Sequence, residues 1–353
     1  MAVIRKNAND KFGFKTIQNI HNNPLVQKSK HMKITKFFLL IICTWLSTAA
    51  FSQNIAQATK LFQQEKYDEA FAILKTVKSG SPQYAESRYY MGQISFRKKE
   101  FDKAEDYIEQ AIDGNKNVAK YHVAMSNVIM RLISDASMIK QASLAGKLRN
   151  HLEEAVRLNP NDMNSSIILV GFYKQAPGIM GGSDDKAKAL ADQISKLSKA
   201  DGHLAFALIY HIDKDFDKAE KNYKSSITLA PDSVKYYYSL AQFYHGQKNP
   251  TKAVDVYEQA LNKFPDNKNL LLQIGRLFAT TENTDVGKGI EYLNTYIKSI
   301  DDKSDLTLGD AYYYLGLIEK NRDNKHLAIA HFNQAIKINP NHRWAKEAIE
   351  ELE

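Results

Sequence analysis

The chain has 353 residues, with 48 Lys or Arg against 40 Asp or Glu and a formal net charge of +8 at pH 7. Residues 1–52 hold eight of the basic residues and one acidic residue, so residues 53–353 carry 40 basic and 39 acidic residues. The basic balance therefore belongs to the N-terminal segment, and the nucleic-acid binding that a basic domain would favour is not indicated.

Residues 32–52 have the three-part pattern of a secretory signal peptide. Lys33 and Lys36 form a positive n-region, residues 37–46 form an apolar h-region, and residues 47–52 are small residues suited to cleavage. The segment resembles a signal peptide, which predicts an exported protein, either periplasmic or secreted.

The alternative for this segment is a retained membrane anchor. The apolar run 37–51 is shorter than the roughly 20 residues that span a bilayer, so we expect cleavage near Gln53 and no stable span in the mature chain. Residues 1–31 lack apolar periodicity and are predicted to be a non-native upstream extension. The single cysteine, Cys43, lies before the cleavage region, so the mature chain would have no disulfide and no cysteine metal site.

A period of 34 residues fills the chain after residue 53. The runs KYDEAFAILKTV, EFDKAEDYIEQAI, DFDKAEKNYKSSI, NPTKAVDVYEQAL and KHLAIAHFNQAI share a small residue followed by apolar or aromatic ones at helical spacing. This resembles the tetratricopeptide repeat, a helix-turn-helix unit with small residues at positions 8, 20 and 27, larger ones at 11 and 24, and proline at 32. Five of the eight prolines occupy that last position: Pro82, Pro160, Pro231, Pro265 and Pro340.

The resemblance predicts an all-α fold, a right-handed α-solenoid of about eight repeats with a C-terminal capping helix. Small residues let two antiparallel helices approach, and the larger ones fill the sides of the contact. The cap is expected at 342–353, where Trp344, Ala348 and Leu352 have helical spacing. The expected repeats are 53–84, 85–118, 119–162, 163–199, 200–233, 234–267, 268–308 and 309–341.

Three repeats depart from the pattern. The third has ten extra residues at its internal turn, where Met138 and Ile139 open a helical pattern, so its second helix is expected to start early. The fourth has five extra residues at the equivalent turn. In the seventh, Gly289 and Tyr296 hold the small positions, so its helix pair is less regular.

The insertion in the fourth repeat, QAPGIMGGSDDKA, is rich in glycine but does not match a phosphate-binding loop. No Gly-Lys pair and no preceding strand are present, and Asp184 and Asp185 would repel a phosphate. Ser183 is placed to cap the next helix, so a structural turn and a partner-contact loop are the two interpretations. We expect Ile179 and Met180 to pack near Met138 and Ile139. The inserted loop comprises Pro177, Gly178, Ile179, Met180, Gly181, Gly182 and Ser183.

The resemblance also implies a concave surface lined by the first helix of each repeat. Side chains at those positions are aromatic, amide-bearing and mostly basic, which suits an extended peptide or protein segment. The family's carboxylate clamp is not matched, since Ile55 and Thr59 occupy its Lys and Asn positions. The candidate groove residues are Tyr89, Gln93, Arg97, Lys120, Asn127, Arg131, Lys174, His211, Lys235, Tyr238, Gln242, His245, Arg276, Tyr313 and Lys320.

The sequence contains no His-Glu-x-x-His or other metal-ligand spacing and no recognisable Ser-His-Asp set, so we expect no enzyme, metal or cofactor. The predicted function is an exported scaffold or adaptor for a protein or peptide partner. One alternative is a small-ligand receptor or enzyme whose pocket is formed by the inserted turns of the third and fourth repeats. The other is a structural protein that self-associates.

Overall fold

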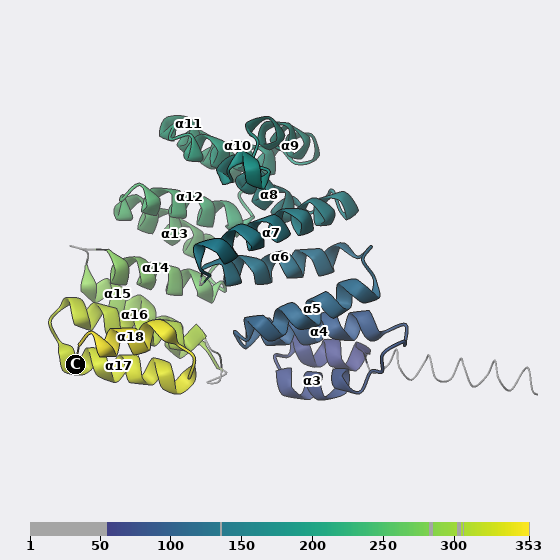
Figure 1. The fold of residues 1–353 in the computed structure, drawn as a ribbon. Coiled ribbons are helices and arrows are strands. Elements are labelled where there is room, and N and C mark those ends of the chain that lie inside the picture. The colour runs from purple at the N-terminus through teal and green to yellow at the C-terminus, as the bar shows by residue number, and fades with distance from the viewer. Residues whose placement is uncertain (1–54, 135, 282–284, 302–304, 306, 353) are drawn as a thin grey trace, which may run out of the picture. The chain divides into compact units, whose positions relative to one another are not determined.

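A computed structural model describes residues 55–134, 136–281, 285–301, 305 and 307–352 (Figure 1). Within these ranges the chain forms α-helices joined by short turns, with one 3-10 turn and no strand. The expected extension 1–31 and signal peptide 32–52 lie outside the described residues. The chain divides into two compact units, Met1–Met91 and Gly92–Glu353, which are described separately.

The first unit contains a helical stretch at 55–63, α3 (Tyr67–Lys75) and the first half of α4 (Tyr84–Arg97). Its core holds Ala58, Ala70 and Leu74, none of which is exposed to solvent. These are the small and large apolar positions expected of the first repeat, so the predicted helix pair is present.

The second unit continues from α4 as consecutive antiparallel helix pairs and a last single helix. Each pair is one predicted repeat, and the seventh is a helix pair like the others. The pairs are α4 with α5 (Phe101–Gly114), α6 (Ala119–Ser134) with α7 (Met138–Leu158), α8 (Met163–Gln175) with α9 (Asp184–Leu197), α10 (Lys199–Ile212) with α11 (Phe216–Leu229), α12 (Val234–Gly246) with α13 (Pro250–Lys263), α14 (Lys268–Thr280) with α15 (Val286–Ser299), and α16 (Thr307–Asn321) with α17 (Lys325–Ile338), followed by α18 (Arg343–Glu350).

Local sequence explains where the helices start and stop. Asp215 and Asn249 accept hydrogen bonds from the backbone N–H three residues on and so cap α11 and α13, which satisfies a donor that the helix leaves unpaired. The turns before these two helices each contain a non-glycine residue with positive φ, Lys214 at 62° and Lys248 at 56°. The same turn chemistry recurs along the chain because each repeat closes its helix pair in the same way.

Glycine at repeat position 8 brings the two helices of a pair into close contact. A Cβ atom on Gly92 would lie 2.6 Å from Ile108, and one on Gly316 would lie 2.4 Å from the ring of Phe332. Both distances are too short for real carbon atoms, so only glycine fits without movement of the partner. The role predicted for the small residues is thus confirmed at these two positions.

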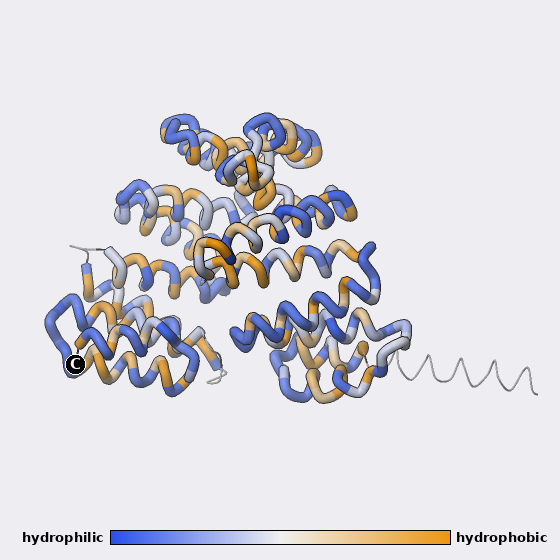
Figure 2. Tube along the Cα trace, in the orientation of Figure 1, coloured by the Kyte–Doolittle hydropathy of each residue, from blue (hydrophilic) through white to orange (hydrophobic). Residues whose placement is uncertain are grey.

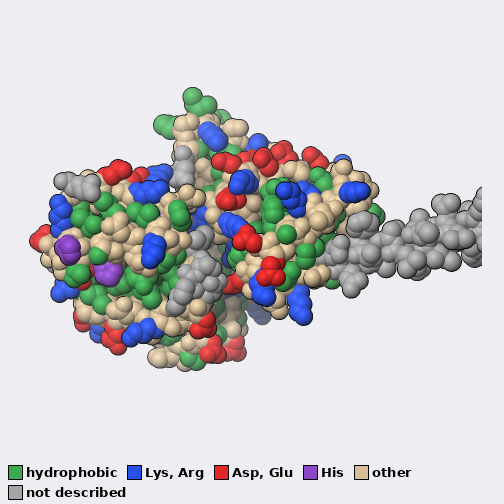
Figure 3. All heavy atoms as spheres, turned by 90° about the horizontal axis from the view of Figure 1, so that it is seen from below, with side chains coloured by type: hydrophobic (Ala, Val, Ile, Leu, Met, Phe, Trp, Pro, Cys, Tyr) green, Lys and Arg blue, Asp and Glu red, His purple; other side chains and the backbone are tan. Residues whose placement is uncertain are grey.

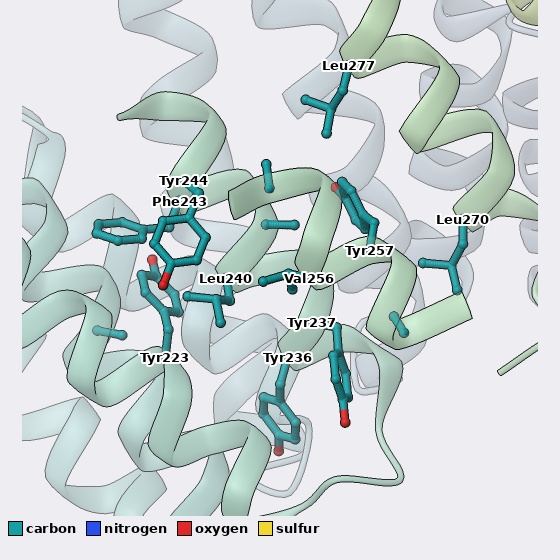
Figure 4. Close-up of a cluster of buried hydrophobic side chains, with 14 of the residues drawn as sticks. Tyr223, Tyr236, Tyr237, Leu240, Phe243, Tyr244, Val256, Tyr257, Leu270 and Leu277 are labelled. Carbon is teal, nitrogen blue, oxygen red and sulfur yellow. The ribbon is translucent and has the colours of Figure 1, made fainter. Parts of the chain in front are cut away.

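The largest described core lies in the fifth to seventh repeats and is rich in tyrosine (Figure 4). Tyr223, Tyr244 and Tyr257 each expose 4% or less of their surface. Figure 4 shows the hydroxyl end of Tyr257 on the Leu277 side of this cluster, while Tyr236 and Tyr237 point their hydroxyls to the opposite side. Along the helices apolar and polar residues alternate in short groups, as expected when one face of each helix is buried (Figure 2).

Two irregular parts of the chain take the form expected of them, with small differences. The helix α7 is 21 residues long and begins at Met138, so the third repeat's insertion lengthens its second helix. In the capping helix α18, Ala345 and Ala348 are buried, whereas Trp344 is 58% exposed and does not serve as a core residue. The helix α16 starts two residues before the expected boundary at 309, and α10 starts one residue before 200.

The predicted fold class, an all-α array of helix-turn-helix repeats, is therefore confirmed, with about eight repeats. None of the helices within the described ranges is both long and apolar enough to cross a membrane. Basic and acidic side chains are interspersed on the face shown in Figure 3, in agreement with the near-neutral balance of residues 53–353.

Candidate partner-binding surface

The predicted groove residues lie on the first helices of the repeats, as expected. Tyr89 lies in the first unit, on α4, and its pKa is raised because the side chain is largely buried, with Tyr90 and Glu86 nearby. All the other candidates lie in the second unit, where the structure shows which of them already have partners within the chain.

Lys174 at the end of α8 is engaged in two ion pairs. Its Nζ lies 2.7 Å from Asp184 at the start of α9 and 2.6 Å from Asp213 at the end of α10. Burial alone would lower the pKa of Lys174, but the two carboxylates more than offset this and raise it. Only 6% of the side chain is exposed, so Lys174 joins the fourth repeat to the fifth and has little surface left for a partner.

Lys235 and Lys320 are also paired within the chain. Lys235 Nζ lies 2.5 Å from the buried carboxylate of Asp201, which accepts a second hydrogen bond from the Tyr236 hydroxyl at 3.0 Å. Lys320 Nζ lies 2.6 Å from Glu351, directly after the capping helix. These two lysines connect neighbouring elements, and their charges are largely neutralised.

His211 and Tyr313 pack against other aromatic rings. The ring centroid of His211 lies 5.2 Å from that of Phe243, and burial lowers the pKa of the histidine. Tyr313 lies 5.8 Å from Phe332 and 5.1 Å from His342, next to the capping helix. Both side chains are half-buried, and both serve the packing between repeats.

A third group lies on α4 and α6, and most of its side chains are exposed. Arg97, Asn127 and Arg131 are exposed, and neither arginine forms an ion pair with a carboxylate in the described part of the chain. Lys120 is exposed and lies over the ring of Tyr121, with Nζ 5.7 Å from its centroid. Gln93 is half-buried on α4.

The structure brings the remaining four candidates together on α12 and α14: Tyr238, Gln242, His245 and Arg276. Tyr238 accepts a hydrogen bond from the Asn269 side-chain amide at 3.1 Å, which links the two helices. His245 has a lowered pKa, first because it is buried and second because the positive charge of Arg276 acts on it. This group, with Asn269, is called the α12–α14 cluster below.

Two members of this neighbourhood were not expected from the sequence, Tyr257 on α13 and Tyr314 on α16. Both have a pKa raised to about 12, mainly by burial, and Arg276 acts on both hydroxyls in the opposite sense. Tyr257 occupies a large-residue packing position, so the sequence indicated only its ring. The sequence did hold one signal for the hydroxyl: this position is a tyrosine, whereas most repeats have an aliphatic residue there.

The inserted loop of the fourth repeat is a structured turn. After Pro177 comes a 3-10 turn, Gly178–Met180, and Gly181 has the positive φ of 93° that glycine adopts without strain. Ser183 Oγ accepts the backbone N–H of Lys186 and so caps α9, as predicted. A Cβ atom on Gly182 would lie 1.7 Å from the carbonyl oxygen of Ala176, which excludes any larger residue there.

The expected contact between the two insertions is wrong. Met138, Ile139 and Ile179 are 85%, 88% and 96% exposed, so none of these three side chains packs on another. The turn is held instead by Arg149, in the middle of α7, whose Nη1 donates to the carbonyl oxygen of Met180 at 3.0 Å.

No group of three or more His, Cys, Asp or Glu side chains that could hold a metal ion occurs among the residues that the structure describes. A shallow pocket lies around α13 and α15, lined by Glu258, Leu271, Lys288, Glu291, Tyr292 and Thr295. It involves neither inserted turn, and Arg149 occupies the space next to the turn of the fourth repeat.

Comparison with known families agrees with the helix pairs. Three family models described as tetratricopeptide repeat match residues 61–127, 213–268 and 309–342. These segments cover most of the first repeat, the second repeat and the start of the third, the second helix of the fifth repeat with the sixth repeat, and the eighth repeat. The chain contains tetratricopeptide repeats.

Curated relatives with tetratricopeptide-like similarity include a receptor subunit and a complex member. The human mitochondrial import receptor subunit TOM70 is 25% identical over 301 residues, covering 78% of this chain and 48% of the relative. The mouse BBSome complex member BBS4 is 21% identical over 200 residues, covering 55% of this chain and 35% of the relative. The chain thus spans about half the length, or less, of these relatives.

Solved structures of similar fold include a tetratricopeptide repeat protein from Parabacteroides merdae. It is 15% identical, covers 86% of this chain and 98% of its own, and has a TM-score of 0.48. A tetratricopeptide protein from Thermus thermophilus, TTC0263, is 17% identical, covers 64% of this chain and 98% of its own, and has a TM-score of 0.42.

Proposed function

We propose that the chain is an exported scaffold or adaptor that binds a protein partner, in extended form, along the first helices of its tetratricopeptide repeats. Repeats of this kind present an extended concave surface, and such surfaces hold other macromolecules. The proposed contact residues are Arg97, Arg131 and Arg276, which form no ion pair with a carboxylate among the described residues, together with the rest of the α12–α14 cluster.

The observation that carries this proposal is the division of the first-helix cations into two sets. Lys174, Lys235 and Lys320 are neutralised by carboxylates of neighbouring elements. Arg97, Arg131 and Arg276 form no ion pair with any carboxylate in the described ranges. Their positive charges and forked donors remain available to an acidic or backbone acceptor of a partner, which the fold alone does not require.

Two further points support the proposal. The names of the curated relatives describe a receptor subunit and a complex member, which are roles carried out with other proteins. Residues 32–52 have the pattern of a signal peptide, so the partner is proposed to lie in the periplasm or outside the cell.

A differential pull-down from envelope extract tests the proposal. The bait is residues 53–353 with Arg97, Arg131 and Arg276 all replaced by Glu, compared with the unchanged bait. The matched control replaces Lys188, Lys221 and Lys298, three exposed cations on second helices, by Glu, and so alters the net charge equally. We expect the first variant to lose proteins that the unchanged bait and the control retain.

Equal recovery with all three baits would contradict the proposal. Light scattering of the unchanged chain, run alongside, distinguishes self-association: a protein that is monomeric but recovers partners through the three arginines is a scaffold. A stable homo-oligomer disrupted by the same arginine variant would instead assign this surface to contacts between copies of the chain.

A further inference from the structure

Tyr257 carries a buried hydroxyl that forms no hydrogen bond with any residue of the described ranges. The residue is 1% exposed, and its Oη is closed off from solvent without a donor or acceptor in bonding geometry. Buried polar atoms in proteins are nearly always paired, because an unpaired one loses its hydrogen bond to water without replacement. An unpaired hydroxyl within the large cluster of buried side chains therefore indicates a partner that is not part of the chain.

The side chains beside this hydroxyl are Gln242 and Arg276. Both act on its pKa as hydrogen-bond donors would, in the direction opposite to burial, yet neither makes a hydrogen bond of normal geometry with it. Gln242 is exposed and Arg276 is half-exposed. Rotation of these two flexible side chains would let a ligand contact the hydroxyl while both side chains donate to it. Figure 4 places the hydroxyl on the Leu277 side, and Leu277 is the residue after Arg276 on α14.

Among the residues that the structure describes, Arg276 has no anionic partner of its own. It acts on the hydroxyls of Tyr257 and Tyr314 and on His245, all of which are neutral at pH 7. The acidic group that acts on Tyr314 is Asp310, and its carboxylate is already held by His342 at 3.3 Å and by Lys99 at 3.2 Å. A guanidinium surrounded by neutral donors has its charge uncompensated on the first-helix surface.

Contacts within the chain also hold the side chains that surround the Tyr257 ring. The ring of Tyr238 meets that of Tyr257 edge-on, with centroids 5.5 Å apart and an interplanar angle of 67°. The Tyr238 hydroxyl is fixed by Asn269, and Asn269 Oδ1 lies 3.4 Å from the Gln273 amide. These contacts hold Tyr257 in place, so the hydroxyl is positioned before any ligand binds, which limits the entropy lost on binding.

From this arrangement we infer that Arg276, the Tyr257 hydroxyl and the Gln242 amide form a subsite for one carboxylate group of the partner. A carboxylate has two oxygens and about four lone-pair directions, which match a forked guanidinium, one hydroxyl and one amide. The inference rests on the proposed function and gives its partner a chemical feature, an acidic side chain or a free C-terminus.

The charge available favours a carboxylate over a phosphate. One cation, Arg276, acts on the site, which balances the single negative charge of a carboxylate, whereas a phosphate monoester carries about −1.5 to −2 at pH 7. The remaining donors are neutral and suit a small planar anion. Because one cation balances one carboxylate, the subsite needs no lysine. The lysine of α12, Lys235, is bound to Asp201.

The direct test is a titration followed by NMR of the arginine side chains in residues 53–353, labelled with nitrogen-15 on arginine. The probes are N-acetylglutamate α-amide, which carries a single side-chain carboxylate, its uncharged analogue N-acetylglutamine α-amide, and inorganic phosphate. We expect N-acetylglutamate α-amide to shift the Arg276 Nε–H signal saturably, and N-acetylglutamine α-amide to leave it unchanged. Equal shifts with both, a stronger response to phosphate than to the carboxylate, or no shift of Arg276 would overturn the assignment.

Variants then separate the subsite from general charge effects. Tyr257→Phe should weaken binding of N-acetylglutamate α-amide about tenfold, since it removes one hydrogen bond to a charged group. Tyr223→Phe, at the equivalent position of the preceding repeat, and Lys221→Gln, at an exposed position of the second helix α11, should change it by less than about twofold. If Tyr257→Phe binds as well as the unchanged chain, the hydroxyl is not part of a subsite; the pull-down with the three arginines decides the proposed function separately.

Discussion

Lys174 Nζ lies 2.6 Å from the carboxylate of Asp213, although the two residues belong to consecutive repeats. With the second pair to Asp184, this lysine ties the end of α8 to the start of α9 and the end of α10. A residue that the sequence placed in the groove therefore contributes to the stability of the array, where each repeat depends on its neighbours.

Replacing Lys174 by Met should lower the free energy of unfolding by about 1 kcal/mol, because two partly exposed ion pairs are lost while the buried stem is kept. Urea denaturation of residues 53–353 measures this. The control is Lys218→Met, which removes an exposed pair within one helix turn, between Lys218 and Asp215. That change should leave the urea midpoint close to that of the unchanged chain, because a fully exposed pair contributes little to stability. Equal effects of the two variants would show that Lys174 does not join the repeats.

Replacing Gly316 by alanine should destabilise the fold. Gly316→Ala places a Cβ atom 2.4 Å from Phe332, which is fully buried, so the helix pair must separate. We expect a loss of about 1–3 kcal/mol in the free energy of unfolding.

The matched control for Gly316 is Gly146→Ala, in the interior of α7, where a Cβ atom would meet nothing within 4 Å. That variant should be more stable by up to about 1 kcal/mol, because alanine favours a helix over glycine. Thermal unfolding followed by circular dichroism gives both signs in one experiment. Loss of stability in both variants would contradict the packing role of position 8.

Two buried tyrosines should respond in opposite directions to loss of the hydroxyl. Tyr257→Phe removes an unpaired buried oxygen and should raise the free energy of unfolding by about 1 kcal/mol. Tyr244→Phe removes a hydroxyl that donates to Glu220 at 2.8 Å and should lower it by about 1 kcal/mol. Denaturant unfolding of both variants measures the difference. A loss of stability in Tyr257→Phe would mean that its hydroxyl is paired in solution.

The histidine pair between α6 and α7 should make the fold sensitive to acid. The Nδ1 atoms of His122 and His151 lie 3.0 Å apart, and His122 Nε2 lies 2.8 Å from the carbonyl oxygen of Lys116, to which it donates. His122 Nδ1 is then the acceptor and His151 Nδ1 the donor.

Burial, the neighbouring His122 and Lys147 lower the pKa of His151 from 6.5 to about 4. The unfolded chain binds this proton first, so the stabilisation is complete above pH 6.5 and is lost as the pH falls from there towards 4. Urea midpoints at pH 7 and pH 5 should differ more for the unchanged chain than for His151→Asn. An unaltered difference in the variant would exclude this pair as the cause.

The repeat pattern was predictable because it follows from backbone geometry. The glycines at position 8, such as Gly92 and Gly316, mark close contacts between the two helices of a pair. The prolines after the second helices mark where those helices end. Both features can be recognised from short stretches of sequence. Even the early start of α7 at Met138 could be read from apolar spacing. These features require no knowledge of which distant residues meet.

The state of each groove residue could not be predicted in the same way. Lys174 and Arg276 are both cations on first helices, and only the structure shows that Asp213 neutralises one of them. Ion pairs between repeats depend on which side chains meet across a packed interface. The hydroxyl of Tyr257 is unpaired because no donor or acceptor of the described residues lies in bonding geometry with it. Neither relationship is visible in the local sequence. The packing expected of Ile179 was wrong for the same reason: the side chain is exposed, and the sequence did not show that Arg149 donates a hydrogen bond to this turn.

The surface used for binding is tested most directly by photo-crosslinking in the native host, with p-benzoylphenylalanine placed at one of two glutamines. Gln242 and Gln259 are both exposed, the first on α12 and the second on α13 of the same repeat. Binding along the first helices predicts a protein adduct from position 242 and none from position 259. An adduct from position 259 alone, or equal adducts from both, would contradict it.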